Sequence, residues 1–195
     1  EMTYQAQAGH PGGSLSAADI VTALYFRVMR IDPARPDWPA RDRFILSKGH
    51  ACPVWYSALM ERGYLGRECL GTLRCLGSPL QGHPDMCKTR GVDFSAGSLG
   101  HGLSAGLGMA LADRLHGLGY RVWVVIGDGE VQEGSIWEAA MAASKFHADN
   151  LTAILDRNRI QNDDFVDNVM PIEPLADKWR AFGWHVIEID GHNMA

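Results

Sequence analysis

The segment from Tyr120 to Asn158, YRVWVVIGDGEVQEGSIWEAAMAASKFHADNLTAILDRN, contains two strand-like runs separated by a helical pattern. Residues 120–126 are almost all β-branched or aromatic, which is typical of a strand buried on both faces of a parallel sheet. The pattern predicts a helix over 135–147 and a second strand over 151–155. The segment therefore predicts a strand–helix–strand unit whose two strands are parallel neighbours.

The rest of the chain continues the alternation of strands and helices. Ser16 and Asp19 form the pattern of a capping box that opens a helix reaching Met29. A helix rich in small residues over 103–116 has the composition for very close packing. Further strands are predicted over 43–47 and 184–190, and further helices over 51–62 and 174–182. This alternation predicts a three-layer α/β/α fold with a mainly parallel sheet.

Length and composition predict one globular domain over 1–195. The chain has 18 basic and 23 acidic residues and a net charge of −5, so it lacks the basic surface that a nucleic-acid partner requires. No apolar run approaches the ~20 residues of a membrane span. The absence of a signal-like N-terminus and of any CxxC pair favours a cytoplasmic protein with reduced thiols. We expect both ends to be cut, because residues 1–8 resemble the end of a helix and the last predicted strand lacks its following helix.

Two polar residues follow the two strands of the opening segment. Asp128 comes after the first strand and Asn158 after the second, a separation of 158 − 128 = 30 residues. Both are expected at the carboxyl edge of the sheet, where open α/β sheets bind ligands. Their oxygen atoms suit Mg²⁺ or Ca²⁺, and the adjacent glycines and helix N-terminus suit a diphosphate. A simple turn explains Gly127–Glu130 equally well when it is taken alone, and the spacing to Asn158 favours the ligand site.

Five groups of residues together resemble the thiamine diphosphate-binding half of transketolases, in family order along nearly the whole chain. The first four groups are Gly9–Ser16 (GHPGGSLS), Leu46–Ala51 (LSKGHA), Gly82–Pro84 (GHP) and Gly97–Gly102 (GSLGHG). The fifth joins Gly127–Gly129 (GDG), Glu133–Gly134 (EG), Trp137–Ala139 (WEA) and Asp156–Asn158 (DRN). The chain is most similar to the N-terminal half of a transketolase, or to the N-terminal subunit of a split one.

The resemblance implies a role for each matching residue. Asp128, Asn158 and the backbone carbonyl of Ile160 would hold a divalent metal, Mg²⁺ or else Ca²⁺ or Mn²⁺. Glu133 and Glu138 match glutamates near the subunit boundary. Four histidines would act on the cofactor and donor sugar: His10, His50, His83 and His101, the last at a position where relatives often have glutamine. The residues that would bind thiamine diphosphate are Leu99, Gly100, Gly127, Asp128, Gly129, Glu130 and Asn158.

The resemblance also implies an activity and a partner. A transketolase transfers a two-carbon ketol unit between sugar phosphates, in the pentose phosphate pathway of carbohydrate metabolism, with thiamine diphosphate as the electron sink. The glutamate that activates the cofactor lies in the family on a pyrimidine-binding domain, for which these residues contain no candidate. We therefore expect a C-terminal pyrimidine-binding half as partner, in a homodimer or heterotetramer, and an isolated fragment without activity.

Three alternatives compete with this interpretation. A non-catalytic module with the same fold has no physical need for metal ligands, so Asp128 and Asn158 disfavour it. An enzyme similar to 1-deoxyxylulose-5-phosphate synthase shares the metal motif, but His10–Gly13 and Gly82–Pro84 resemble transketolase. A nicotinamide site at Gly100–Gly106 is disfavoured, because no strong strand precedes it and no acidic residue closes a following strand.

Overall fold

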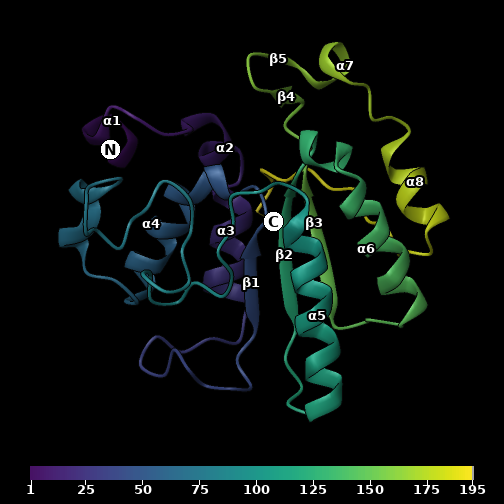
Figure 1. Cartoon of the computed structure of the whole chain (residues 1–195), viewed down its shortest axis with the longest axis horizontal. Helices are drawn as coiled ribbons and strands as arrows, with labels where there is room; N and C mark the ends of the chain where they lie inside the picture. Colours follow the sequence, from purple (N-terminus) through teal and green to yellow (C-terminus); the bar gives the residue numbers. More distant parts are fainter. Residues whose placement is uncertain (195) are drawn as a thin grey trace.

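A parallel sheet of three strands lies at the centre of the computed structural model, which describes residues 1–194 (Figure 1). The strand order is β1 (Arg43–Leu46), β2 (Val122–Gly127) and β3 (Leu151–Asp156). In the register, Gly127 at the end of β2 stands opposite Asp156 at the end of β3. The two strands of the opening segment are therefore parallel neighbours, as predicted.

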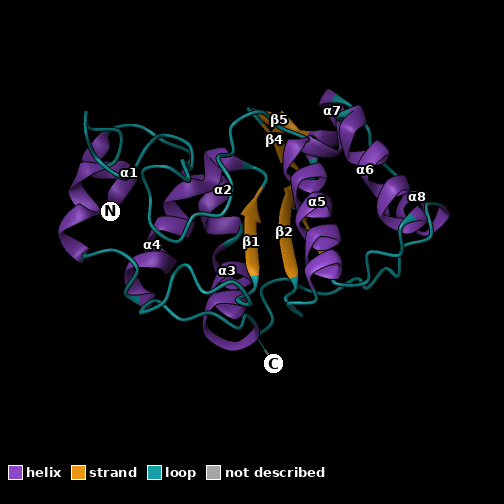
Figure 2. Cartoon of the chain, turned by 60° about the horizontal axis from the view of Figure 1, so that its bottom comes forward, coloured by secondary structure: helices purple, strands orange, loops and turns teal. Residues whose placement is uncertain are grey.

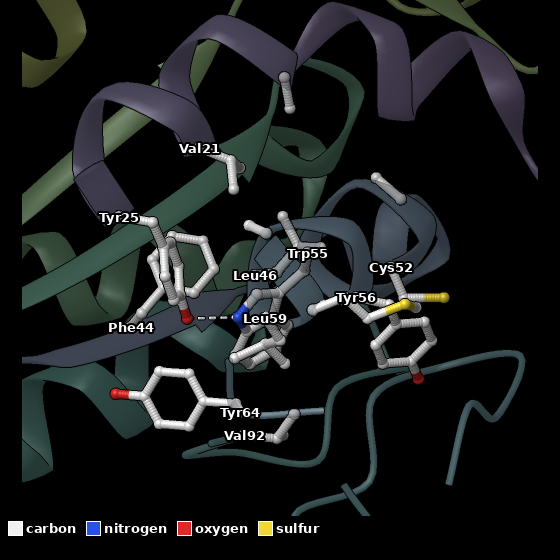
Figure 3. Packing of buried hydrophobic residues seen from close by; sticks show 14 of the residues in the cluster. Val21, Tyr25, Phe44, Leu46, Cys52, Trp55, Tyr56, Leu59, Tyr64 and Val92 are labelled. Carbon is white, nitrogen blue, oxygen red and sulfur yellow. Dashed lines mark hydrogen bonds between the residues drawn. The ribbon is translucent and has the colours of Figure 1, made fainter. Parts of the chain in front are cut away.

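One face of the sheet packs on α3 (Ala18–Ala23) and α4 (Cys52–Arg62). Phe44 of β1 makes edge-on ring contacts with Tyr25 and Trp55, at centroid distances of 5.3 and 5.0 Å. The indole N–H of Trp55 donates a hydrogen bond to the Tyr25 hydroxyl, so this aromatic core leaves neither group unpaired (Figure 3).

The other face packs on α5 (His101–His116) and α6 (Gly134–Lys145). Residues alternate between the two faces along β1, because Ile45 joins this core while its neighbours Phe44 and Leu46 join the first. Helices thus cover both faces (Figure 2), which confirms the predicted three-layer α/β/α fold.

The remaining elements are short, and several of them surround the carboxyl edge of the sheet. None of the helices within residues 1–194 is both long enough and apolar enough to cross a bilayer. A π-helical turn (Leu24–Val28) extends α3, and 3-10 turns occupy Gly49–Ala51, Arg67–Thr72 and Gly129–Gln132. The other elements are α1 (Met2–Ala6), α2 (Pro11–Ser16), the antiparallel pair β4 (Ile160–Gln161) and β5 (Asp164–Phe165), α7 (Val166–Val169) and α8 (Leu175–Ala181).

Two local predictions are wrong. Ser16 does not cap a helix: it ends α2, and its hydroxyl donates a hydrogen bond to the buried Asp156 carboxylate instead of accepting one at a helix N-terminus. Residues 184–190 do not form a strand in the described structure. Trp184 and Val186 pack on the second core in an alternating pattern, which explains the prediction, but the backbone joins no strand ladder.

The close packing predicted for α5 depends on Gly106. A Cβ atom added at this residue would lie 2.6 Å from a methyl group of Val124 in β2, whereas one at Gly108 of the same helix would meet nothing within 4 Å. Gly106→Ala is therefore expected to lower the free energy of unfolding by about 1–3 kcal/mol, and Gly108→Ala to raise it by up to about 1 kcal/mol. Urea unfolding measures both, and equal effects of the two substitutions would contradict this packing.

Candidate active site

The ends of β1 and β2 meet the N-terminus of α5 around one buried carboxylate. Glu130, 3% exposed, accepts hydrogen bonds from the Ser47 hydroxyl after β1, the Gly100 amide before α5 at 2.8 Å, and the Gly127 amide of β2 at 3.0 Å. Burial raises the pKa of Glu130, while these hydrogen bonds oppose the shift. Glu130 thus holds together the loops that carry the candidate residues, rather than facing an open space.

Asp128 and Asn158 lie at the same edge, as their spacing predicted. Asp128, 3% exposed, accepts hydrogen bonds from the amide of Gly129 on Oδ1 and from that of Arg159 on Oδ2, at 2.8 and 2.6 Å. The guanidinium of Arg157 lies 3.2 Å from the same Oδ2 atom. The Asn158 side-chain oxygen accepts a hydrogen bond of 3.0 Å from the Ile160 amide.

These contacts leave oxygen atoms that fit a hard divalent cation. A carboxylate oxygen or an amide oxygen offers about two lone pairs. Asp128 Oδ1 and Asn158 Oδ1 each accept one hydrogen bond, so each retains one lone pair. Oxygen atoms of this kind are the ligands that Mg²⁺ and Ca²⁺ prefer. Among residues 1–194, no cluster of three or more His, Cys, Asp or Glu side chains offers a different metal site.

Glycines shape the backbone beside these ligands. A Cβ atom at Gly129 would lie 2.9 Å from the Gln161 side chain of β4, which covers this turn. Gly100 has φ +84°, and a Cβ there would lie 2.5 Å from the Ser135 hydroxyl at the start of α6. Gly100 is thereby placed against the β2–α6 connection, and the half-buried Leu99 precedes it in the chain.

Three of the four predicted histidines come together. The rings of His10 and His50 meet edge-on with centroids 5.2 Å apart, and His83 is close enough to act electrostatically on both. His101 stands apart at the start of α5, exposed, and its side chain has no hydrogen-bond partner within residues 1–194. His10 precedes α2 and His50 precedes α4, and these two helices are in contact (Figure 1).

Two rings of the histidine cluster, those of His50 and His83, favour the neutral form. Burial, with electrostatic contributions from the neighbouring His10 ring and the Lys48 ammonium group, lowers the pKa of His50 to about 4. Burial and the nearby Arg74 guanidinium lower the pKa of His83 as well. Neutral rings at physiological pH can accept as well as donate a hydrogen bond.

His50→Gln is expected to reduce the loss of stability between pH 7 and pH 5. The pKa of His50 falls from 6.5 to about 4 on folding, so the unfolded chain binds a proton in this window that the folded chain does not. Stability therefore decreases as the pH falls toward 4, and His50 contributes about 1 kcal/mol of that decrease after allowance for its partial exposure. Urea unfolding at both pH values measures the difference. An identical pH dependence in the variant would contradict a neutral His50.

A comparison with known families agrees with this geometry. A family model described as "Transketolase, thiamine diphosphate binding domain" matches residues 1–195. The chain belongs to this family.

Relatives of this domain include proteins that are named as transketolase subunits. The 6-deoxy-6-sulfo-D-fructose transketolase subunit of Clostridium sp. (strain MSTE9) is 53% identical, over 95% of this chain and 67% of its own length. An apulose-4-phosphate transketolase subunit of Phocaeicola vulgatus is 47% identical, over 100% of this chain and 69% of its own length. The transketolase of Leishmania mexicana superposes with a TM-score of 0.93 at 32% identity, over 96% of this chain and 30% of the solved chain. The chain thus spans less than a third of that solved transketolase.

Sequence reasoning missed three charged residues of this transketolase domain. Lys48 and Asp156 form a buried ion pair, and Arg157 lies between Asp128 and Glu173, 3.2 and 2.8 Å from their carboxylates. All three belong to quoted motifs, LSKGHA and DRN. The signal that could have found Lys48 and Asp156 is a charged residue directly at the end of an apolar strand.

Proposed function

We propose that the chain is the thiamine diphosphate-binding part of a transketolase that transfers a two-carbon ketol unit between sugar phosphates. One observation carries this proposal: Asp128 and Asn158 follow neighbouring strands at the same edge of the sheet, and His50, whose ring contacts that of His10, follows the adjacent strand β1. A metal–diphosphate anchor and a set of neutral proton carriers are the two parts that such a reaction needs from this domain.

The proposed anchor is a divalent metal, for which Mg²⁺ is the first choice. Asp128, Asn158 and the Ile160 carbonyl would hold it, and Gly127, Gly129 and the N-terminus of α6 would face the diphosphate. The bound thiamine diphosphate supplies the electron sink that makes the ketol carbon–carbon bond breakable. Glu130 acts here through its hydrogen bonds to the loops of Gly100 and Gly127, as a positioning residue.

The proposed catalytic groups of this chain are its histidines. An imidazole ring at His10, His50 or His83 can accept a hydrogen bond from a sugar hydroxyl, and can take up the proton and return it later. His101 lies apart from this cluster, on the side of the site next to Gly100. We assign it to the rim that faces the substrate.

The proposed assembly is completed by a pyrimidine-binding half that supplies the activating carboxylate. Relatives that are named as subunits support a separate partner chain, either in a heterotetramer or, if the halves are joined, in a homodimer. The names of these relatives contain different sugars, so the donor and acceptor of this chain are proposed only as sugar phosphates or related acidic sugars. We place the enzyme in the cytoplasm.

The proposal is tested with the assembled enzyme, xylulose 5-phosphate and ribose 5-phosphate. We expect ketol transfer that requires thiamine diphosphate and Mg²⁺, and a decrease in kcat of about 10²–10⁴-fold for His83→Ala with little change in cofactor affinity. Coupled detection of the aldose product gives kcat, and calorimetry gives the affinity. Cofactor binding without transfer of any sugar would instead support a non-catalytic module. Equal losses in kcat and affinity would place His83 in the cofactor site.

A further inference from the structure

One buried ion pair spans the whole carboxyl edge of the sheet. Lys48 Nζ lies 2.5 Å from Asp156 Oδ2, and the two side chains are 2% and 7% exposed. Lys48 follows β1 and Asp156 ends β3, so the pair joins two strands that are not neighbours in the order β1-β2-β3.

The path of the lysine crosses the end of the middle strand. A Cβ atom at Gly127 would lie 3.6 Å from Lys48 Cδ, so the aliphatic stem passes directly against this glycine. The pair also reaches α2, because Lys48 Nζ donates to the Gly13 carbonyl at 3.2 Å and the Ser16 hydroxyl donates to Asp156 Oδ1 at 2.6 Å. One pair thus fixes α2 and the ends of β1 and β3 around the end of β2.

A contribution to folding stability does not by itself explain why this ion pair is buried here. Removing two charges from water costs about as much as their attraction returns, and apolar replacements of both partners are often neutral or stabilising. The position of the pair offers a better reason. Lys48 precedes His50 by two residues, and Asp156 precedes Asn158 by two. The pair therefore sets the distance between the histidine cluster and the candidate metal ligands.

We propose that Lys48 and Asp156 are positioning residues that hold the Asn158 loop and the His50 loop in one rigid frame for the metal–diphosphate group. This inference rests on the proposed function, because it concerns the cofactor site named there. Neither residue is proposed to contact the reacting atoms. The expected consequence is that cofactor affinity depends on the pair even where stability does not.

The test separates affinity from stability with apolar replacements in the assembled enzyme. Lys48→Met or Asp156→Leu alone leaves one unpaired buried charge and is expected to lower Tm by about 10 °C or more. The double variant is expected to regain a Tm within about 5 °C of wild type, because neither partner leaves an unpaired buried charge. Its affinity for thiamine diphosphate in the presence of Mg²⁺, measured by calorimetry, is expected to remain at least about tenfold weaker.

A matched control is the pair of Arg41 and Asp93, which lies at the opposite end of β1. Its atoms are also 2.5 Å apart, with side chains 13% and 6% exposed. A difference in Tm between the double variant Arg41→Met/Asp93→Leu and wild type, in either direction, does not bear on the test. The cofactor affinity of this variant is expected to stay within about twofold of wild type, because these residues lie away from the site. An equal loss of affinity in this control would overturn the proposal, because any disturbed pair would then have the same effect.

Lys48→Arg provides a second test in case the double variant fails to fold. It keeps the positive charge, but its wider planar guanidinium cannot reproduce the position of the ammonium group. We expect a folded enzyme with cofactor affinity at least about threefold weaker. Wild-type affinity in either Lys48→Arg or the folded double variant overturns the positioning role and leaves the proposed function intact. A wild-type enzyme that binds no thiamine diphosphate overturns both.

Discussion

Asp128→Asn is expected to weaken the binding of thiamine diphosphate, in the presence of Mg²⁺, by at least about 100-fold in the assembled enzyme. Loss of a group that only supports a metal ligand typically costs about 10–100-fold, and Asp128 is the one carboxylate assigned to the metal itself. Asparagine preserves the shape of the side chain, but its single oxygen can accept only one of the hydrogen bonds that Oδ1 and Oδ2 of Asp128 accept from the Gly129 and Arg159 amides. The substitution therefore removes the charge and one backbone hydrogen bond, and calorimetry with and without Mg²⁺ measures the metal-dependent part of the loss.

Asp37→Asn is the matched control for Asp128→Asn. It makes the same change in net charge at an exposed residue, in the segment before β1. We expect its cofactor affinity to equal that of wild type. If Asp128→Asn also bound the cofactor with wild-type affinity, the metal assignment to Asp128, Asn158 and Ile160 would be wrong.

The arrangement of Asp128 and Asn158 was predictable because it depends on strand connectivity alone. Consecutive parallel strands joined by one helix are usually neighbours, and the register of Gly127 with Asp156 places the two residues at one edge. The same reasoning predicted that helices cover both faces of β2, since its run of β-branched and aromatic residues is apolar on both sides. Patterns of this kind require no knowledge of distant side chains.

The features that the sequence could not predict depend on contacts between residues that are far apart along the chain. Ser16 matched a helix cap, but its hydroxyl bonds to Asp156, 140 residues away in the sequence. Glu130 directly follows the family motif Gly127–Gly129, but only the fold reveals that its carboxylate joins Ser47, Gly100 and Gly127. Residues 184–190 have a strand pattern without a ladder, because side-chain alternation does not supply a neighbouring backbone. Contacts between remote segments decided each case.

Residues 1–195 expressed alone are expected to transfer ketol units at least about 10²–10⁴-fold more slowly than the same residues mixed with a pyrimidine-binding half. That factor is the usual contribution of one positioned acid or base, and the resemblance to transketolases assigns the activating carboxylate to the other domain. The two glutamates that match the family's subunit boundary, Glu133 and Glu138, are exposed. They are therefore accessible to a partner chain, as a residue at the boundary between two halves must be.

The measurement uses xylulose 5-phosphate and ribose 5-phosphate with the isolated chain, then with increasing amounts of the partner half, while circular dichroism verifies that the isolated chain is folded. Activity should rise in proportion to the assembled complex and saturate at a defined stoichiometry. Glu133→Gln should shift this titration to higher partner concentrations if the residue lies at the boundary, whereas Glu68→Gln, an exposed glutamate in the turn Arg67–Thr72, should leave it unchanged. Full turnover by the isolated chain would contradict the assignment of the activating carboxylate to the pyrimidine-binding half. It would mean that a carboxylate within these residues activates the cofactor, and Glu133, next to Gly100, would be the first to test.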